Sequence, residues 1–290
     1  MTEPQTHTID VPGVILTYDV RPAVDGRAAT EPPLLMFGSP MDASGFVELA
    51  GHFPDRTVVT YDPRGVGRST RTDAQRTSTP EQHASDLHAI IEALGGGPVD
   101  AFASSGGAVN ALALVAAYPG DLRTLVAHEP PTATLLPDAD RASAAILAIG
   151  AAYEAEGFGA GMSRFIATTG HRGEFPAGFA EQPGPDPAMF GMPAGDDGSR
   201  DDALLAQNLI SCTHFRPDFD AVRSAPTRVI VAAGEDSSGE MAYRAAFVVA
   251  ERLGHQPVIF PSHHGGFVGG DGPWAGKPAD FAARLRETLS

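Results

Sequence analysis

The chain is poor in cysteine, in positive charge and in long apolar stretches. Its one cysteine, Cys212, cannot form an internal disulfide, which fits a reducing compartment. The 290 residues carry a formal net charge of −16, which argues against nucleic acid or an anionic membrane as ligand, because both attract Lys and Arg. No window is apolar for the length of a membrane span, and the first residues show no secretory signal. These absences predict a cytoplasmic protein.

Motifs for nucleotides and metals are missing as well. The chain has no Walker A loop and no G-x-G-x-x-G after its first predicted strand, which argues against nucleotide binding. Zinc hydrolases usually show closely spaced ligands such as H-E-x-x-H, and this pattern is absent. Some potential ligands could still cluster in the fold, namely Glu129, Asp236, His263 and His264. We expect neither a cofactor nor a metal.

Short segments rich in β-branched and aromatic residues recur along the chain. They predict eight strands, at residues 6–11, 14–20, 33–37, 57–61, 99–103, 124–129, 228–233 and 257–260. The first three follow one another closely and predict an antiparallel meander. From residue 57 onward strands alternate with helical patterns, such as residues 80–94, which predicts a parallel, doubly wound sheet.

Nearly a hundred residues between the sixth and seventh predicted strands break this alternation. Helical patterns occupy residues 138–157, 160–169 and 199–212, and residues 170–198 form a long loop rich in Gly, Pro and Asp. Open α/β sheets bind ligands at the carboxyl ends of their strands, so we interpret the insertion as a cap over that edge. A separate helical domain on a linker is the alternative. The predicted domains are therefore a core of residues 1–130 and 226–290, and a cap of residues 131–225.

The segment AFASSGGAVN, residues 101–110, joins a predicted strand to a predicted helix through two serines and two glycines. Ser105 is the only serine with a small residue two positions away on both sides. This pattern is typical of a nucleophile elbow, although a plain tight turn uses the same residue types. Ser104 fits the elbow less well, because Phe102 lies where a small residue would be needed.

Candidate partners for such a serine follow the neighbouring strands. A serine hydroxyl becomes a nucleophile when a base takes its proton and an acid orients that base. Ser105 ends the fifth predicted strand, Glu129 the sixth and Asp236 the seventh, while His263 and His264 follow the eighth. Because parallel strands end at one edge of the sheet, we expect these side chains to gather there. This order of serine, acid and histidine is the strongest functional signal in the sequence.

The chain resembles proteins of the α/β-hydrolase fold that carry a cap, over essentially its whole length. The likeness rests on FGSPMDASGF, YDPRGVGRST, AFASSGGAVNAL, LVAHEPP and FPSHHGGF. One departure is Phe37, where many members carry a histidine. The resemblance implies an eight-stranded, mostly parallel sheet flanked by helices, with a helical cap between strands six and seven. It also implies structural roles for Arg64 and Gly65.

The resemblance assigns most of the catalytic roles. Ser105 is the expected nucleophile, and His264 the expected base, because it fits the family's pattern of a histidine, two further residues and an aromatic. His263 is then a lining or surface residue. The backbone N–H of Gly106 is the expected first donor of an oxyanion hole, and the likeness places the second at Ser39.

Two carboxylates compete for the role of the triad acid. Most α/β-hydrolases carry it three residues beyond a glycine after the seventh strand, and here that position is Ser237. Asp236 lies one residue early, a shift that turns a side chain to the other face of an extended segment. Some capped families, certain haloalkane dehalogenases among them, place the acid after the sixth strand, where Glu129 stands. We therefore expect Glu129 as the acid, with Asp236 as the alternative.

The remaining histidines are expected to be structural. His128 should point away from Glu129, because neighbouring strand residues face opposite sides. His52, His83 and His88 are expected on helical surfaces.

These residues predict a cofactor-independent serine hydrolase with a small-molecule substrate. It would cleave an ester, lactone or thioester of a small to medium, partly apolar substrate through an acyl-enzyme. A C–C bond hydrolase and a cofactor-free perhydrolase use a similar constellation and are alternatives. A ligand-binding protein without catalysis on the same fold is a further alternative, because fold does not fix function.

Overall fold

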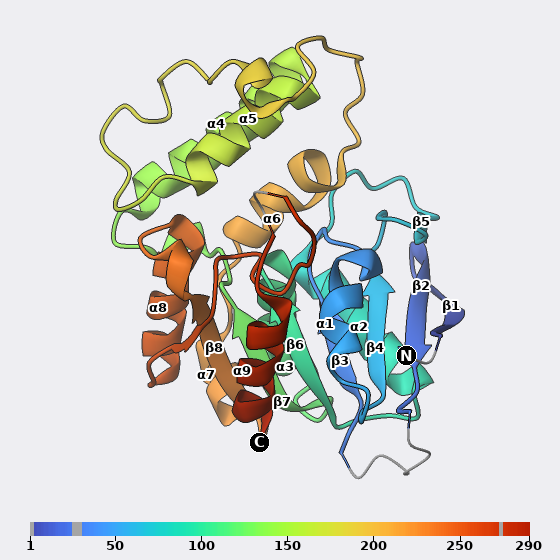
Figure 1. Cartoon of the computed structure of the whole chain (residues 1–290). Coiled ribbons are helices and arrows are strands. Elements are labelled where there is room, and N and C mark those ends of the chain that lie inside the picture. Colours follow the sequence, from blue (N-terminus) through green and yellow to red (C-terminus); the bar gives the residue numbers. More distant parts are fainter. Residues whose placement is uncertain (1–2, 25–30, 273–274) are drawn as a thin grey trace.

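A nine-stranded sheet forms the centre of the computed structural model, which describes residues 3–24, 31–272 and 275–290 (Figure 1). Its order is β1-β2-β4-β3-β6-β7-β8-β9, and β5 pairs with β2. The strands are β1 Gln5–Val11, β2 Val14–Arg21, β3 Leu34–Phe37, β4 Val58–Asp62, β5 Thr70–Arg71, β6 Val99–Ser104, β7 Leu122–His128, β8 Arg228–Gly234 and β9 Val258–Phe260. All eight predicted strands are present, and the two-residue β5 is additional.

The predicted three-strand meander is wrong for its third member. β1 and β2 are antiparallel, and β2 pairs antiparallel with β4, but β3 lies between β4 and β6 and is parallel to both. All four residues of β3 are buried, whereas β1 is largely exposed. A strand that is apolar on both faces needs a place inside the sheet, with helices on either side. The apolar composition of β3 therefore decides its place in the sheet, and its proximity to β2 along the chain does not.

Helices cover both faces of the sheet. They are α1 Val47–Gly51, α2 Pro80–Ala93, α3 Gly106–Ala117, α7 Phe219–Ser224, α8 Met241–Leu253 and α9 Pro278–Leu289. Residues of α2, α3, α7 and α8 share one apolar cluster, and residues of α1 and α9 share the cluster on the other face. Within β3, Leu35 and Phe37 face the first cluster, while Leu34 and Met36 face the second. This alternation follows from the pleat of a strand.

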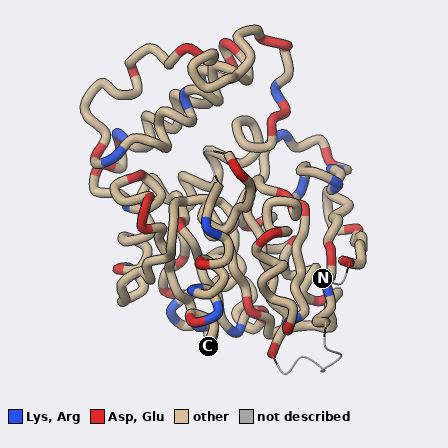
Figure 2. Tube along the Cα trace, in the orientation of Figure 1, with Lys and Arg blue, Asp and Glu red and all other residues tan. Residues whose placement is uncertain are grey.

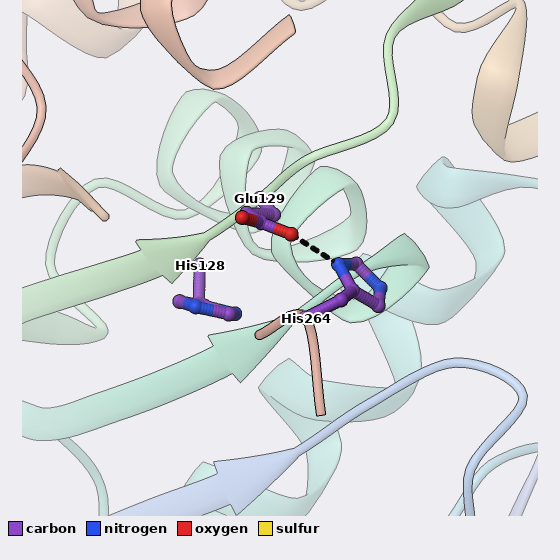
Figure 3. Close-up of side chains that lie close together, drawn as sticks. All are labelled: His128, Glu129 and His264. Atoms are coloured by element: carbon purple, nitrogen blue, oxygen red, sulfur yellow. Dashed lines mark hydrogen bonds and ion pairs between the residues drawn. The ribbon is translucent and has the colours of Figure 1, made fainter. Parts of the chain in front are cut away.

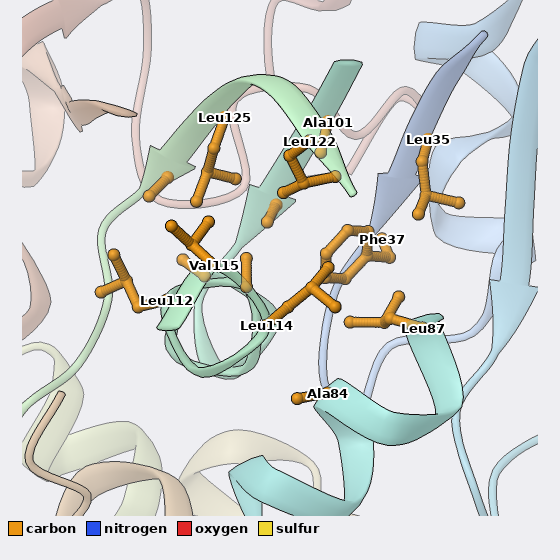
Figure 4. Packing of buried hydrophobic residues seen from close by; sticks show 14 of the residues in the cluster. Leu35, Phe37, Ala84, Leu87, Ala101, Leu112, Leu114, Val115, Leu122 and Leu125 are labelled. Atoms are coloured by element: carbon orange, nitrogen blue, oxygen red, sulfur yellow. The ribbon is translucent and has the colours of Figure 1, made fainter. Parts of the chain in front are cut away.

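Helix α3 is buried almost completely in the first cluster. Ten of its twelve residues are buried, and Figure 4 shows its leucine and valine side chains against β6, β7 and α2. A helix that is apolar on all sides belongs in a core. The packing fixes α3 in place, and with it the turn that precedes its first residue, Gly106.

The turn after β4 is held by a buried ion pair. Arg64 donates two hydrogen bonds to Asp86 of α2, from Nε at 2.8 Å and from Nη2 at 2.6 Å.

The chain has 36 acidic and 20 basic residues, and both kinds are spread over the core and the insertion (Figure 2). Within the ranges that the structure describes, no helix combines the length and the apolar character that a membrane crossing requires.

The insertion between β7 and β8 contains α4 Ala139–Glu156, α5 Phe158–Thr169 and α6 Leu209–Thr213. The predicted helix at residues 199–212 is shorter and consists of a π-helical segment, Ala203–Asn208, followed by α6. Helices α4 and α5 lie side by side beyond the edge of the sheet (Figure 1). They form a third apolar cluster, which continues onto α8 through Met241 and Ala245.

Candidate active site

Ser105 occupies a strained turn between β6 and α3. Its backbone has φ 59° and ψ −128°, and its N–H donates to the carbonyl of His128 at 2.9 Å. The two following glycines permit close approach to the turn after β3. A Cβ on Gly107 would lie 2.7 Å from the Cα of Gly38, so only glycine fits there. This is the geometry of the predicted elbow.

The two residues predicted to carry the oxyanion donors, Ser39 and Gly106, lie next to each other. A Cβ on Gly106 would lie 2.7 Å from the carbonyl oxygen of Ser39, and both residues are buried. Gly106 is also the first residue of α3, where the helix dipole presents positive potential. The structure therefore brings the turn after β3 and the start of α3 together at one point, directly after Ser105.

Glu129 is locked in place at the end of β7. Its N–H donates to the carbonyl of Ala232 in β8 at 2.9 Å, and its Oε1 accepts the N–H of Gly234 at 2.8 Å. Its Oε2 lies 2.5 Å from Nδ1 of His264 (Figure 3). Burial alone would raise the pKa of this carboxyl, but the hydrogen bond and charge of His264 lower it to about 2. Glu129 is therefore ionised near neutral pH.

Nδ1 of His264 faces the Glu129 carboxylate. An ionised carboxylate can only accept, so Nδ1 carries a hydrogen, and in the neutral ring Nε2 is the unprotonated nitrogen. Desolvation lowers the pKa of His264, but the hydrogen bond and charge of Glu129 and the charge of Glu240 raise it above its ordinary value. His263 is turned elsewhere: its Nδ1 accepts the N–H of Gly265 at 3.0 Å.

Asp236, the alternative acid, lies apart from this pair. It sits in a short 3₁₀ turn, Glu235–Ser237, where its side chain is exposed and its N–H donates to Ser262 at 3.0 Å. Over the described part of the chain, no hydrogen bond joins the Asp236 carboxylate to His264. The structure thus places Glu129, and not Asp236, against the histidine.

Backbone strain concentrates at this edge of the sheet. Among the described residues, three that are not glycine have a positive φ: Ser105 at 59°, Glu129 at 48° and Ser262 at 71°. They follow the ends of β6, β7 and β9. Such conformations persist where the surrounding structure enforces them, and they cluster at functional sites. The positive φ angles therefore indicate a functional site at the carboxyl edge of the sheet, and this evidence does not depend on the family resemblance.

A metal ion fits this cluster poorly. His128, Glu129 and His264 offer ligand atoms within 4.8 Å of one another. Two ligands of one zinc ion, each about 2.0–2.1 Å from it in tetrahedral geometry, lie about 3.3 Å apart. The Glu129 and His264 atoms are only 2.5 Å apart, the distance of a short hydrogen bond. The arrangement is that of an acid–base pair.

The other histidines differ from one another. His128 was expected to point away from Glu129, but this is wrong, because a ring nitrogen of the buried His128 lies within 4.8 Å of a carboxylate oxygen of Glu129. His83 was expected on a helical surface, and this is wrong, because the side chain is completely buried. His83 shares a helix face with Leu87, four residues later, and this spacing could have predicted that His83 is buried. Sequence reasoning also missed Asn208, which contacts His83 across 125 residues and has no local signal.

Comparisons with known proteins agree with this fold. Residues 34–165 match the family model described as the alpha/beta hydrolase fold. The uncharacterized hydrolase YraK of Bacillus subtilis is 27% identical over 278 residues, covering 90% of each chain. A thermophilic esterase from Thermogutta terrifontis superposes with a TM-score of 0.62 at 19% identity, over 99% of this chain and 98% of that one. The N-acyl homoserine lactonase AidH gives a TM-score of 0.62 at 17% identity, over 99% of this chain and 96% of that one.

The sheet order, the strained turn after β6 and the comparisons with known proteins together define the fold class of this chain. The chain has the α/β-hydrolase fold, and its residues 34–165 match the family model of that fold. More particularly, it is similar along most of its length to the uncharacterized hydrolase YraK.

Proposed function

We propose that this protein is a serine hydrolase that cleaves carboxylic esters, including lactones and thioesters, through an acyl-enzyme. The observation that carries the proposal is the hydrogen bond between Glu129 and His264, 2.5 Å long, at the sheet edge where Ser105 forms its strained turn. A ligand-binding protein would need neither an oriented, unprotonated imidazole nitrogen nor the strain at Ser105. The pair therefore favours catalysis over binding alone.

The steps follow from the roles of these groups. Nε2 of His264 takes the proton of Ser105 as its Oγ attacks the carbonyl carbon of the substrate, and the electron pair of that carbonyl moves onto its oxygen. The N–H groups of Ser39 and Gly106 hold this oxyanion. When the tetrahedral intermediate collapses, the leaving alcohol or thiol receives the proton from His264. Water then attacks the acyl-enzyme in the same way, and the acid is released.

Glu129 stabilises the positive charge that forms on His264 during each proton transfer. It does so as a buried carboxylate that also accepts a backbone N–H from Gly234, so it does not need to reorganise. The same triad could serve C–C bond cleavage or perhydrolysis. The esterase and lactonase among the similar structures support ester chemistry as the first class to test.

We further propose that residues 131–225 act as a cap. Helices α4 and α5 lie beyond the strand ends (Figure 1), and α6 reaches the site itself. The Sγ of Cys212 lies 3.3 Å from where a Cβ on Gly106 would be. A small, partly apolar substrate would therefore meet side chains of the insertion on its way to Ser105.

The test is a panel of p-nitrophenyl esters, lactones and thioesters assayed with the native protein, Ser105→Ala and the control Ser104→Ala. We expect turnover of at least one class, loss of about 10³-fold or more in Ser105→Ala, and retention in Ser104→Ala. A fluorophosphonate probe should label Ser105, as read by peptide mass spectrometry. Full activity in Ser105→Ala, or an adduct on Ser104, would show that the assignment is wrong.

A further inference from the structure

A buried polar cluster joins the insertion to the turn after β3. It consists of Ser39, His83 of α2 and Asn208, the last residue of the π-helical segment Ala203–Asn208. Asn208 is 1% exposed, His83 is 0% exposed and Ser39 is 6% exposed. Polar groups this deeply buried are costly unless they are hydrogen-bonded, so the orientation of each is informative.

The amide of Asn208 has one consistent orientation. Its Nδ2 donates to the carbonyl of Ala203 at 2.7 Å, and a carbonyl can only accept. Its Oδ1 therefore faces the other way, 2.8 Å from Nε2 of His83 and 3.4 Å from Oγ of Ser39. Since Oδ1 can only accept, Nε2 of His83 carries a hydrogen and the hydroxyl of Ser39 donates. Burial lowers the pKa of His83 to about 4, so its ring is neutral.

The segment that carries Asn208 is anchored at both ends. Asp202 accepts the N–H groups of Leu204 and Leu205, at 3.0 and 2.8 Å, which caps the start. Near the end, the carbonyl of Gln207 accepts the N–H of Ser78 from the core at 2.9 Å. π-helical turns are rare and are frequently found at functional sites. Asn208 is the last residue of this one.

We propose that Asn208 is a positioning residue for the oxyanion turn. By accepting the hydroxyl hydrogen of Ser39, it fixes that residue against Gly106, where a Cβ would lie only 2.7 Å from the Ser39 carbonyl oxygen, and so holds the turn that carries the proposed second oxyanion donor. This inference rests on the proposed function, because it assigns a support to the oxyanion hole of that reaction. The residue lies in the insertion, so the insertion helps to assemble the catalytic site as well as covering it.

The effect should appear in the transition state and not in substrate binding. The negative charge on the oxyanion exists only after attack, so a displaced donor lowers kcat and leaves KM nearly unchanged. A hydrogen bond of this kind corresponds to a loss of about tenfold in kcat. A general loosening of the insertion would instead change KM.

The experiment compares Asn208→Ala, Ser39→Ala and the double variant with the matched control Gln207→Ala. Ser39→Ala keeps the backbone N–H and removes only the hydroxyl. Gln207 lies in the same segment, and its side chain donates to Asp201 at 2.9 Å, away from the cluster. We expect each single variant to lose about tenfold in kcat with KM unchanged, the double variant to lose no more, and Gln207→Ala to keep both constants.

A trifluoromethyl ketone, whose serine adduct carries an oxyanion, should bind the Asn208→Ala and Ser39→Ala variants about tenfold more weakly. Unchanged kcat in these variants, additive losses in the double variant, or a change in KM alone would overturn the positioning role. If Asn208→Ala does not fold, Ser39→Ala alone decides by the same criteria. Failure of the proposed function would be recognised separately, by activity that persists in Ser105→Ala.

Discussion

The ends of β7 and β8 are neighbours in the sheet and both lead into acidic residues, but they present those residues in opposite ways. After β7, Glu129 is completely buried, has a left-handed backbone and contacts His264. After β8, the chain enters a 3₁₀ turn that leaves Asp236 exposed. At the usual place of the family's acid stands Ser237, which is buried.

The difference lies in what the neighbouring backbone provides. Glu129 is held by Ala232 and Gly234 of β8, which satisfy its own N–H and one carboxylate oxygen. The carboxylate of Asp236 lies at the surface and its backbone carbonyl accepts from Arg172 of the insertion. A carboxylate at a strand end becomes an oriented acid when the next strand supplies its hydrogen bonds. Position along the strand is not sufficient.

The largest expected effect comes from removing the charge at the end of β7. Glu129→Gln should lower kcat by about 10⁴-fold, because the imidazolium loses its buried counter-charge and the histidine its fixed tautomer. Asp236→Asn, the matched control, should stay within about twofold of the native kcat, since its carboxylate makes no contact with His264. Steady-state kinetics at equal melting temperature measure both. The opposite ranking would make Asp236 the acid.

A smaller effect is expected from moving the acid to the end of β8. In the Glu129→Gln background, Ser237→Asp should restore about 10- to 100-fold of the lost kcat, because it puts a carboxylate at the family's usual place. Ser238→Asp, at an exposed neighbour, should restore nothing. Recovery in both variants, or in Ser238→Asp alone, would mean that general surface charge and not orientation supports the histidine.

The smallest effect concerns the pKa of His264. Glu129 and Glu240 raise it above the ordinary 6.5, so kcat/KM should fall on the acid side with a pKa above that value, because the base acts when neutral. Glu129→Gln should lower the pKa of His264, and Asp236→Asn should leave it in place. Titration of the imidazole by NMR measures this without turnover. A shift caused by Asp236→Asn alone would contradict the comparison.

Much of this site could be predicted from the sequence, because its parts follow strands. Ser105, Glu129 and His264 come directly after apolar runs, and parallel strands carry such residues to one edge. The position of β3 was not predictable from chain order, since pairing depends on which faces of a strand are apolar. At the level of sequence, the choice between Glu129 and Asp236 depended on the resemblance. Only the three-dimensional structure shows which of the two carboxylates contacts His264.

The insertion was predicted in outline only. Its helices α4 and α5 have regular apolar patterns, so their positions followed from spacing. Asn208 lies 169 residues from Ser39, and nothing in its neighbours indicates that a polar side chain there points into the core. Contacts between residues so far apart in the sequence depend on how the insertion packs against the core. The sequence pattern around Asn208 carries no information about this packing.

Two of the three residues with a positive φ, Ser105 and Glu129, are also members of the proposed triad, so the proposed chemistry reduces the stability of the fold. Each such backbone costs on the order of 1–3 kcal/mol, whereas a folded domain has a net stability of only about 5–15 kcal/mol. Glycine at Ser105 or Glu129 would relieve the cost but would also delete a side chain of the proposed triad. Substitutions that raise the stability of this protein would therefore have to lie elsewhere in the molecule, because the strain at these two positions cannot be removed without losing the proposed triad.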